Sequence, residues 1–152
     1  MCIRDRYGAK SFYNNLIELV DSAAKTDGIM RIIGGGQSQS FYETLSSYYN
    51  DYLKYCSKAR VKKYLLTSEE YLDDFAKVFG QEKSTKLKSL SSIISAPTYT
   101  RITQEMVTTE IYMKEVVVIQ IRNKAVAQSY LQHFELMWDL SLIHISEPTR
   151  PY

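Results

Sequence analysis

The chain has 152 residues, of which 45% are hydrophobic and 24% are charged, proportions that are ordinary for one soluble globular domain with a hydrophobic core. The formal net charge of +2 is too small to require a nucleic-acid or membrane partner. No apolar run approaches the roughly 20 residues that span a bilayer, and no signal-peptide pattern opens the sequence, so we expect a cytoplasmic protein.

Hydrophobic periodicity predicts helices and strands that alternate in the first half of the chain and strands that follow one another in the second half. The polar stretch Gln81–Ser89 carries no predicted element, and Ser91–Pro97 is ambiguous and is treated mostly as loop. The predicted elements are, in chain order, a helix from Ala9 to about Lys25, a strand Ile29–Ile33, a helix capped by Ser38 or Ser40 and reaching about Tyr55, a strand Val61–Leu66, a helix capped at Thr67 or Ser68 and ending at Phe79, a strand Tyr99–Thr103, a hairpin with arms Thr109–Met113 and Val116–Ile121, and a helix from Asn123 to about Leu140.

This order, α-β-α-β-α-β-β-β-α, predicts the α/β class. Early β-α-β units favour parallel strands because a helix can carry the chain back to the start of the next strand. The late hairpin adds antiparallel strands. We therefore expect one mixed, mostly parallel sheet flanked by helices.

The turn between the first predicted strand and the next helix is the strongest local candidate for a ligand site. Its backbone N–H groups would lie at the positive end of a helix dipole, which suits a phosphate or a carboxylate. The P-loop ending and the Gly-x-Gly-x-x-Gly spacing are both absent, so glycines that only relieve a tight turn are the favoured interpretation and an anion site is the second. The turn comprises Gly34, Gly35, Gly36, Gln37 and Ser38.

No set of residues completes a catalytic or metal site. Apart from the chain ends, Cys56 and His133 are the only cysteine and histidine, and neither has a partner at nucleophile–base or metal-ligand spacing. We expect Cys56 in the core and His133 exposed or structural on a helix. The adjacent acids Glu69-Glu70 and Asp73-Asp74 point in different directions on a helix and are expected in solvent. No catalytic residue, metal ligand or cofactor is predicted.

Two basic clusters and a tyrosine stripe are candidate binding surfaces. No aromatic-basic stacking pattern accompanies the basic residues, so a solvated surface is the favoured interpretation. The tyrosines are expected in the core or at a dimer interface, since tyrosine combines a large apolar ring with a polar tip. The basic clusters are Lys58, Arg60, Lys62 and Lys63, and Lys83, Lys86 and Lys88; the stripe is Tyr48, Tyr52 and Tyr55.

The C-terminal part of the chain resembles the TrmB-type transcription regulators, in their C-terminal domain of phospholipase-D-like fold. The resemblance lies in the hairpin Thr109–Ile119 and the helix segments Asn123–Tyr130 and Phe134–Trp138, and the upstream strands and helices follow a similar order. Its motif residues are chiefly structural. They are Tyr112, Asn123, Tyr130, Phe134 and Trp138.

The resemblance implies a non-catalytic domain that senses an effector or dimerises, normally behind a DNA-binding winged helix that this sequence lacks. The expected partners are a small-molecule effector (a sugar or another anionic or polar metabolite) and a second copy of the chain, with DNA contacted only through the missing domain and no membrane partner. Catalytic phospholipase D relatives carry His-x-Lys-x-x-x-x-Asp, and neither histidine here is followed two residues later by lysine. The alternatives are a degenerate or partial phospholipase-D-type phosphodiesterase domain and a pure oligomerisation module.

Both ends of the chain resemble translated sequencing-adapter read-through, which occurs in genes assembled from metagenomic reads. The segments are residues 1–6 and 141–152, and Pro148 and Pro151 block a helix in the second. We expect the domain itself to span residues 7–140, and the gene to be truncated on both sides.

Overall fold

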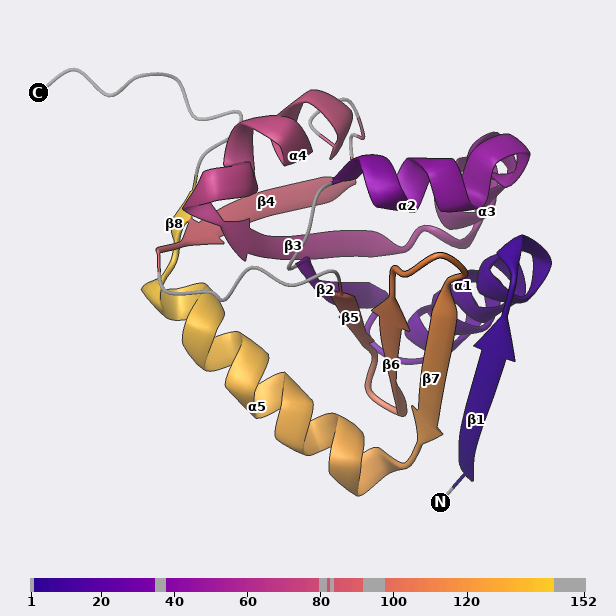
Figure 1. The fold of residues 1–152 in the computed structure, drawn as a ribbon. Helices are drawn as coiled ribbons and strands as arrows, with labels where there is room; N and C mark the ends of the chain where they lie inside the picture. Colours follow the sequence, from indigo (N-terminus) through magenta and orange to yellow (C-terminus); the bar gives the residue numbers. More distant parts are fainter. Residues whose placement is uncertain (1, 35–37, 80–81, 83, 92–97, 144–152) are drawn as a thin grey trace, which may run out of the picture.

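A computed structural model describes residues 2–34, 38–79, 82, 84–91 and 98–143. Within them one eight-stranded sheet runs in the order β1-β7-β6-β5-β2-β3-β4-β8 (Figure 1). The strands are β1 (Cys2–Tyr7), β2 (Ile29–Gly34), β3 (Lys62–Ser68), β4 (Thr85–Leu90), β5 (Thr98–Ile102), β6 (Met106–Ile111), β7 (Val117–Arg122) and β8 (Leu142–Ile143).

Helices cover both faces of the sheet, and each face has its own hydrophobic core. In the larger core, the four helices α1, α2, α3 and α4 pack against one face of the sheet. Phe12, Phe41 and Phe75 are fully buried in this core. The smaller core lies under α5, where Leu131 and Phe134 pack against the opposite face. The helices are α1 (Ala9–Lys25), α2 (Ser38–Leu45), α3 (Tyr49–Ala59), α4 (Leu72–Phe79) and α5 (Lys124–Leu140), with 3-10 turns at Ser46–Tyr48 and Glu69–Tyr71. None of these helices is both long and apolar enough to cross a membrane.

The predicted α/β class with a mixed sheet flanked by helices is confirmed, but the sheet is less parallel than expected. Among the described strands only β2–β3 and β3–β4 pair in parallel. The other five pairings are antiparallel. The reason is that β5 enters antiparallel to β2 and the chain then folds back twice by short turns, which can only join antiparallel neighbours.

Strand β4 is the internal element that the sequence analysis missed. Its residues Thr85–Leu90 pair with β3 along their whole length, within a stretch expected to carry no element. Only Leu87 and Ser89 are buried, because β4 lies near the edge of the sheet and its lysines alternate to the other face. A half-polar strand of this kind has a weak hydrophobic signal.

The helix predicted from Ser38 or Ser40 to about Tyr55 is two helices. Ser46 has φ 48°, which lies outside the right-handed helical region, and the chain turns there between α2 and α3. The side chains of Ser38 and Ser40 lie outside the described residues. At the next helix, Ser68 makes no side-chain cap, and the Thr67 hydroxyl instead donates to the carbonyl of Gly34 at 3.1 Å.

The chain ends contribute the two outermost strands. Strand β1 pairs with β7 from Cys2 to Tyr7, and β8 pairs with β4 over two residues. Strand pairing needs only backbone N–H and C=O groups, so an added segment can join an open sheet edge. The predicted adapter origin of both ends stays a prediction.

Candidate functional site

Gly34, the described part of the predicted glycine turn, is required by close packing. A Cβ atom at Gly34 would lie 2.9 Å from Cζ of Phe75, a buried ring of α4. The residue is therefore glycine because α4 lies directly over the end of β2. Gly35, Gly36 and Gln37 lie outside the described residues, as does the side chain of Ser38, which begins α2. The anion site at this turn stays a prediction.

Four of the five motif residues at the C-terminal end make capping, hydrogen-bond or packing contacts. The Asn123 side chain accepts a hydrogen bond from the Val126 N–H at 2.9 Å and caps α5, as predicted. Phe134 is buried, and the Trp138 ring stacks on Tyr64 with centroids 5.2 Å apart. Two further members are Tyr112, whose hydroxyl donates to Glu110, and Tyr130, which is exposed.

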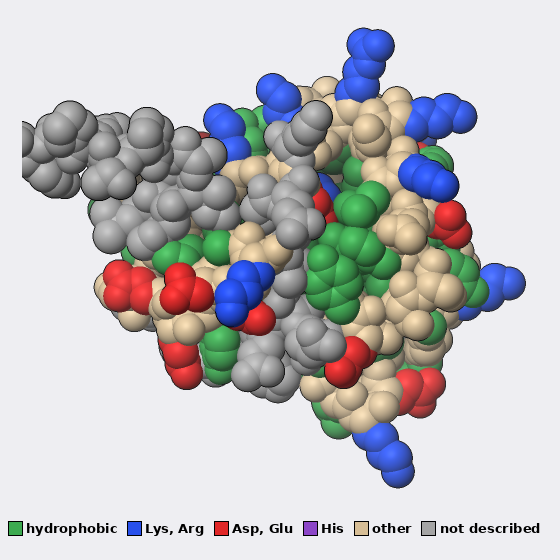
Figure 2. All heavy atoms as spheres, turned by 90° about the horizontal axis from the view of Figure 1, so that it is seen from above, with side chains coloured by type: hydrophobic (Ala, Val, Ile, Leu, Met, Phe, Trp, Pro, Cys, Tyr) green, Lys and Arg blue, Asp and Glu red, His purple; other side chains and the backbone are tan. Residues whose placement is uncertain are grey.

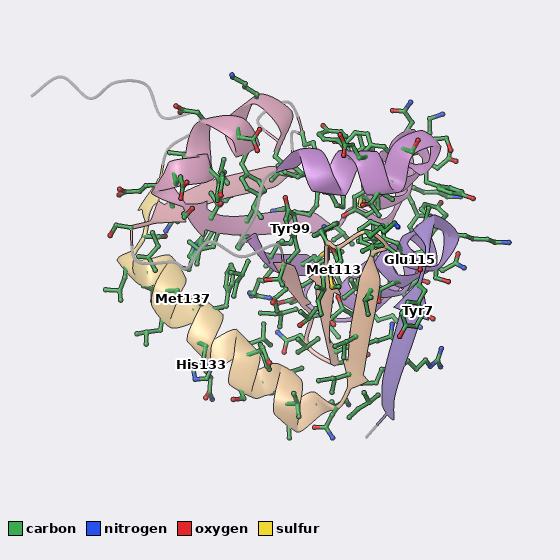
Figure 3. The ribbon with its side chains drawn as sticks, in the orientation of Figure 1. Tyr7, Tyr99, Met113, Glu115, His133 and Met137 are labelled. Carbon is green, nitrogen blue, oxygen red and sulfur yellow. The ribbon has the colours of Figure 1, made fainter. Side chains whose placement is uncertain are left out.

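The isolated histidine and cysteine occupy the positions expected of them. His133 is exposed on the outer side of α5 (Figure 3). Cys56 is buried in the larger core, and burial raises the pKa of its thiol, which disfavours the nucleophilic thiolate. Glu69 and Glu70 are exposed. In the described part of the chain, no group of three or more His, Cys, Asp or Glu side chains is placed to hold a metal ion.

The tyrosine stripe belongs to the packing between α3 and its neighbours. Tyr52 is buried in the core, and Tyr48 stacks on Tyr13 of α1 with centroids 4.9 Å apart. The Tyr55 hydroxyl donates to Asp21 of α1 at 2.5 Å. These contacts support the core interpretation of the stripe.

A buried charge pair, Arg101–Glu110, crosses β5 and β6 on the α1–α4 side of the sheet, and the sequence analysis did not single it out. Their side chains are 2% and 0% exposed. The Tyr112 hydroxyl donates to the second oxygen of Glu110 at 2.7 Å, and the Arg101 guanidinium lies 4.8 Å from the centroid of the Phe41 ring. Burial alone would lower the pKa of Arg101, but the Glu110 carboxylate raises it, so the guanidinium stays charged.

A cavity of about 750 Å³ opens between α3 and the start of β3. We call it the α3–β3 cavity. Figure 2 shows the molecule from the side of α2, α3 and α4. Hydrophobic side chains gather near the middle of this view, and lysine and arginine side chains project around the outline of the molecule. The cavity is lined by Tyr42, Tyr49, Asn50, Leu53, Cys56, Ser57, Arg60, Val61, Lys62, Lys63, Glu82 and Ser84.

A hydrogen-bonded network centred on Glu82 forms one wall of the cavity. The carboxylate accepts from the Tyr49 hydroxyl at 2.7 Å and from the Thr85 hydroxyl at 2.9 Å, and it pairs with the Lys63 ammonium. The Tyr42 hydroxyl donates in turn to the Tyr49 hydroxyl at 3.0 Å. Burial and the hydrogen bond to Glu82 raise the pKa of Tyr49, so its hydroxyl remains a proton donor.

The basic residues that sequence reasoning placed in solvent divide into two groups. Lys58, Arg60 and Lys62 are exposed, as expected. Lys63 is only 2% exposed, because strand alternation turns it to the same face as Leu65. That expectation was wrong for Lys63.

Two other lysines lie over aromatic rings that the sequence does not place beside them. The Lys86 ammonium is 5.3 Å from the centroid of Tyr64, and the Lys88 ammonium is 4.5 Å from that of Trp138. The rings come from the neighbouring strand β3 and from α5, so no local spacing in the sequence could reveal the aromatic-basic contacts.

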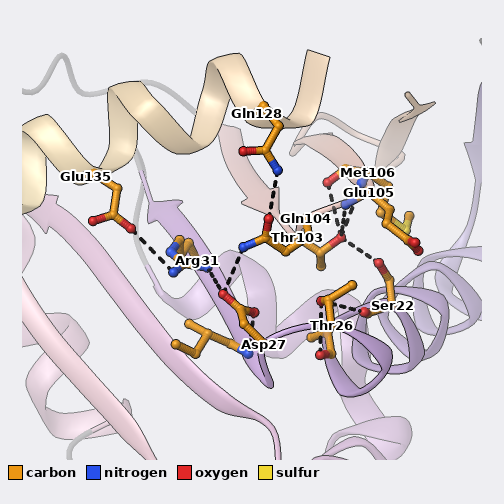
Figure 4. A network of polar contacts seen from close by, with 12 residues as sticks. Ser22, Thr26, Asp27, Arg31, Thr103, Gln104, Glu105, Met106, Gln128 and Glu135 are labelled. Atoms are coloured by element: carbon orange, nitrogen blue, oxygen red, sulfur yellow. Dashed lines mark hydrogen bonds and ion pairs between the residues drawn. The ribbon is translucent and has the colours of Figure 1, made fainter. Parts of the chain in front are cut away.

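A second group of polar residues joins α5 to the sheet (Figure 4). The Gln128 amide donates to Gln104 at 2.7 Å, and the Gln104 amide donates to Asp27 at 3.1 Å. Arg31 bonds Asp27 at 2.9 Å and approaches Glu135 at 3.4 Å. These groups satisfy one another, and the two hollows beside them, of about 410 and 420 Å³, are smaller than the α3–β3 cavity of about 750 Å³.

Neither the protein-family models nor the curated proteins gave a match to the chain. Solved structures do match it. The phospholipase D family member Nuc from Salmonella typhimurium superposes with a TM-score of 0.64 and 15% identity, over 95% of this chain and 99% of that one. The fold is phospholipase-D-like. NucT from Helicobacter pylori superposes with a TM-score of 0.62 and 9% identity, over 94% of this chain and all of that one.

A third similar structure is TrmBL2, an archaeal chromatin protein described as showing a novel mode of DNA binding. It superposes with a TM-score of 0.60 and 13% identity, over 95% of this chain but 55% of that chain. The present chain thus spans about half the length of TrmBL2. At these identities the likeness concerns the phospholipase-D-like fold and not the activity.

Proposed function

We propose that this phospholipase-D-like domain is a non-catalytic sensor that binds a small polar metabolite in the α3–β3 cavity. The cavity carries the proposal: its volume of about 750 Å³ lies within the range of small-molecule sites, and hydroxyl, amide and charged groups surround two tyrosine rings. Such a lining suits a ligand that combines a ring with hydrogen-bonding groups.

The non-catalytic part of the proposal rests on the nucleophiles. His133 faces solvent on α5, and the pKa of Cys56 is raised by burial. Neither histidine precedes a lysine by two residues, as phospholipase-D chemistry would require. These observations favour binding over hydrolysis.

The regulatory part of the proposal rests on the resemblance of the C-terminal residues to TrmB-type regulators and on the likeness in fold to half of TrmBL2. In this proposal the domain belongs to a cytoplasmic, homodimeric TrmB-like transcription regulator and contacts DNA only through a separate domain. The dimer is checked by light scattering on the purified chain.

Leu53→Trp tests the cavity, because a bulky ring at this lining position would fill it. We expect a sugar, sugar phosphate or nucleotide from a defined panel to raise the melting temperature by about 5–10 °C at a hundredfold excess over Kd, and Leu53→Trp to abolish the rise. The matched control is Leu136→Trp on the exposed face of α5, which should keep it.

Two results would count against the proposal. Stabilisation that survives in Leu53→Trp would place the ligand elsewhere. Hydrolysis of bis(p-nitrophenyl) phosphate above background by the purified chain would contradict the non-catalytic assignment.

A further inference from the structure

The mouth of the α3–β3 cavity carries positive charge that the described residues do not balance. Arg60 and Lys62 both line it and both are exposed. Their backbone N–H groups donate to the carbonyls of Ser57 and Gly28. Within the described part of the chain, no ion pair joins the Arg60 guanidinium or the Lys62 ammonium to an acidic side chain.

Glu82, which provides the carboxylate in the lining, has little capacity left for a ligand. A carboxylate offers about four acceptor positions. Tyr49, Lys63 and Thr85 already occupy three on Glu82, and Lys63 neutralises its charge. A cationic ligand would therefore find no unpaired negative charge on Glu82, whereas an anion would find the positive charges of Arg60 and Lys62.

The backbone at Arg60 supplies an independent observation. Arg60 ends α3 in the left-handed conformation, with φ 57° and ψ 37°, and its N–H donates to the last carbonyls of the helix. Glycine is the usual residue at such a position, since a Cβ there is strained. A cation near a helix C-terminus complements the dipole, but Lys58 in the last turn already does this. The Arg60 side chain thus stands at a backbone position that favours glycine, and it lines the cavity.

The lining also offers aromatic surface. The rings of Tyr42 and Tyr49 have centroids 4.4 Å apart and are joined by the hydrogen bond between their hydroxyls. Leu53 adds an apolar side chain to the lining. A ligand ring can pack here while its charged end reaches Arg60 and Lys62.

We propose that the ligand of the α3–β3 cavity is a small ring-bearing metabolite with a phosphate group, and that Arg60 and Lys62 bind the phosphate. This inference rests on the proposed function, since it names the chemical class for the same cavity. Arg60 offers paired N–H donors to phosphate oxygens, and Lys62 adds a point charge. A neutral sugar would engage only the tyrosine wall and the amide of Asn50.

The test is calorimetric titration of the whole chain with pairs of probes that differ only in phosphate: ribose and ribose 5-phosphate, glucose and glucose 6-phosphate, adenosine and AMP, with inorganic phosphate alone. We expect a phosphorylated member to bind at least about tenfold more tightly than its parent, because a charge-assisted hydrogen bond has that effect. Its affinity should fall as salt is added.

The key variant is Arg60→Gly, which removes the cation and relieves the left-handed strain. We expect it to melt no lower than the parent protein while it loses about tenfold or more in affinity for the phosphorylated probe. Lys62→Ala should weaken binding as well. The matched control, Lys58→Ala, removes a cation from the same helix end outside the lining and should leave affinity unchanged.

The outcomes separate the two proposals. Equal affinity for a sugar and its phosphate, or unchanged affinity in Arg60→Gly, overturns the phosphate inference while the cavity remains a ligand site. Binding of a single-stranded oligonucleotide in place of every small probe would assign the basic mouth to a polymer and overturn it too. If no probe binds, both proposals fail.

Discussion

Arg101 and Glu110 form a charge pair that has no access to solvent. Removing two charges from water costs several kcal/mol each, and only close pairing with further hydrogen bonds offsets that cost. The Tyr112 hydroxyl supplies one such bond to Glu110, and the Phe41 ring lies against the guanidinium. Either residue alone would be an uncompensated buried charge.

Arg101→Met should therefore lower the free energy of unfolding by about 3–5 kcal/mol, a large share of the total for a single domain. The double variant Arg101→Met/Glu110→Gln should recover most of this loss, because it removes the stranded carboxylate and keeps an acceptor for Tyr112. Urea denaturation measures both values.

The control for this pair is the exposed one between Arg122 and Glu18, where Arg122→Met should cost no more than about 1 kcal/mol. A double variant as unstable as Arg101→Met alone would show that the shape of the arginine side chain, and not its charge, is what the core requires.

Some side-chain roles could be predicted from the sequence and others could not. The caps and apolar stripes were predictable because they depend on local spacing, and Asn123 caps α5 as expected. The burial of Lys63 was not predictable, since it depends on pairing with the carboxylate of Glu82, 19 positions further along the chain. Paired buried charges look like ordinary surface charges until the partner is known.

Helix α5 is held to the sheet by polar contacts as well as by its small core. Asp27 is the common acceptor of this group, from Gln104 of the β5–β6 turn and from Arg31 of β2. Burial alone would raise the pKa of Asp27, but the hydrogen bonds from Gln104 and Arg31 outweigh it and lower the pKa below 3.8. The ionised form is therefore the one that the fold favours.

A lowered folded-state pKa fixes how this contribution depends on pH. It is complete above the unfolded value of 3.8 and is lost as the pH falls through the lower folded value. Asp27→Asn should cost about 0.2–1 kcal/mol at pH 7, since the carboxylate is partly exposed, and the difference from the parent should shrink towards about pH 3. Unfolding curves at both pH values test this, with exposed Asp139→Asn as the control. An equal cost at both pH values would contradict the role of the charge.

At the scale of elements, the sequence predicted those with strong periodicity. Helices α1 and α5 lie where their apolar stripes placed them, and the late hairpin is β6 and β7. Strand β4 was missed because lysines alternate with its two buried residues, so it has only half of the usual hydrophobic pattern. The break at Ser46 was missed because a positive φ and a short 3-10 turn, with no proline or glycine, separate α2 from α3.

For the whole molecule, the phospholipase-D-like fold was accessible from the sequence, but the cavity was not. Its walls come from α2, α3, the start of β3 and residues Glu82 and Ser84, which only the parallel β3–β4 pairing brings together. Because β4 itself was not predicted, Glu82 and Lys63 could not be placed side by side. The glycine turn could be proposed as a ligand site from the sequence because its residues are consecutive in the chain.

The central claim is that this domain binds its ligand in the α3–β3 cavity. The most direct test is a two-dimensional NMR titration of the isotope-labelled chain with ribose 5-phosphate as the probe. We expect the largest amide shifts to cluster at the cavity lining, from Asn50 to Leu53 and from Ser57 to Lys63, while amides near Gln104 and Gln128 stay in place. Shifts centred on Gln104 and Gln128, or no shift at the cavity at the highest soluble concentration, would contradict it.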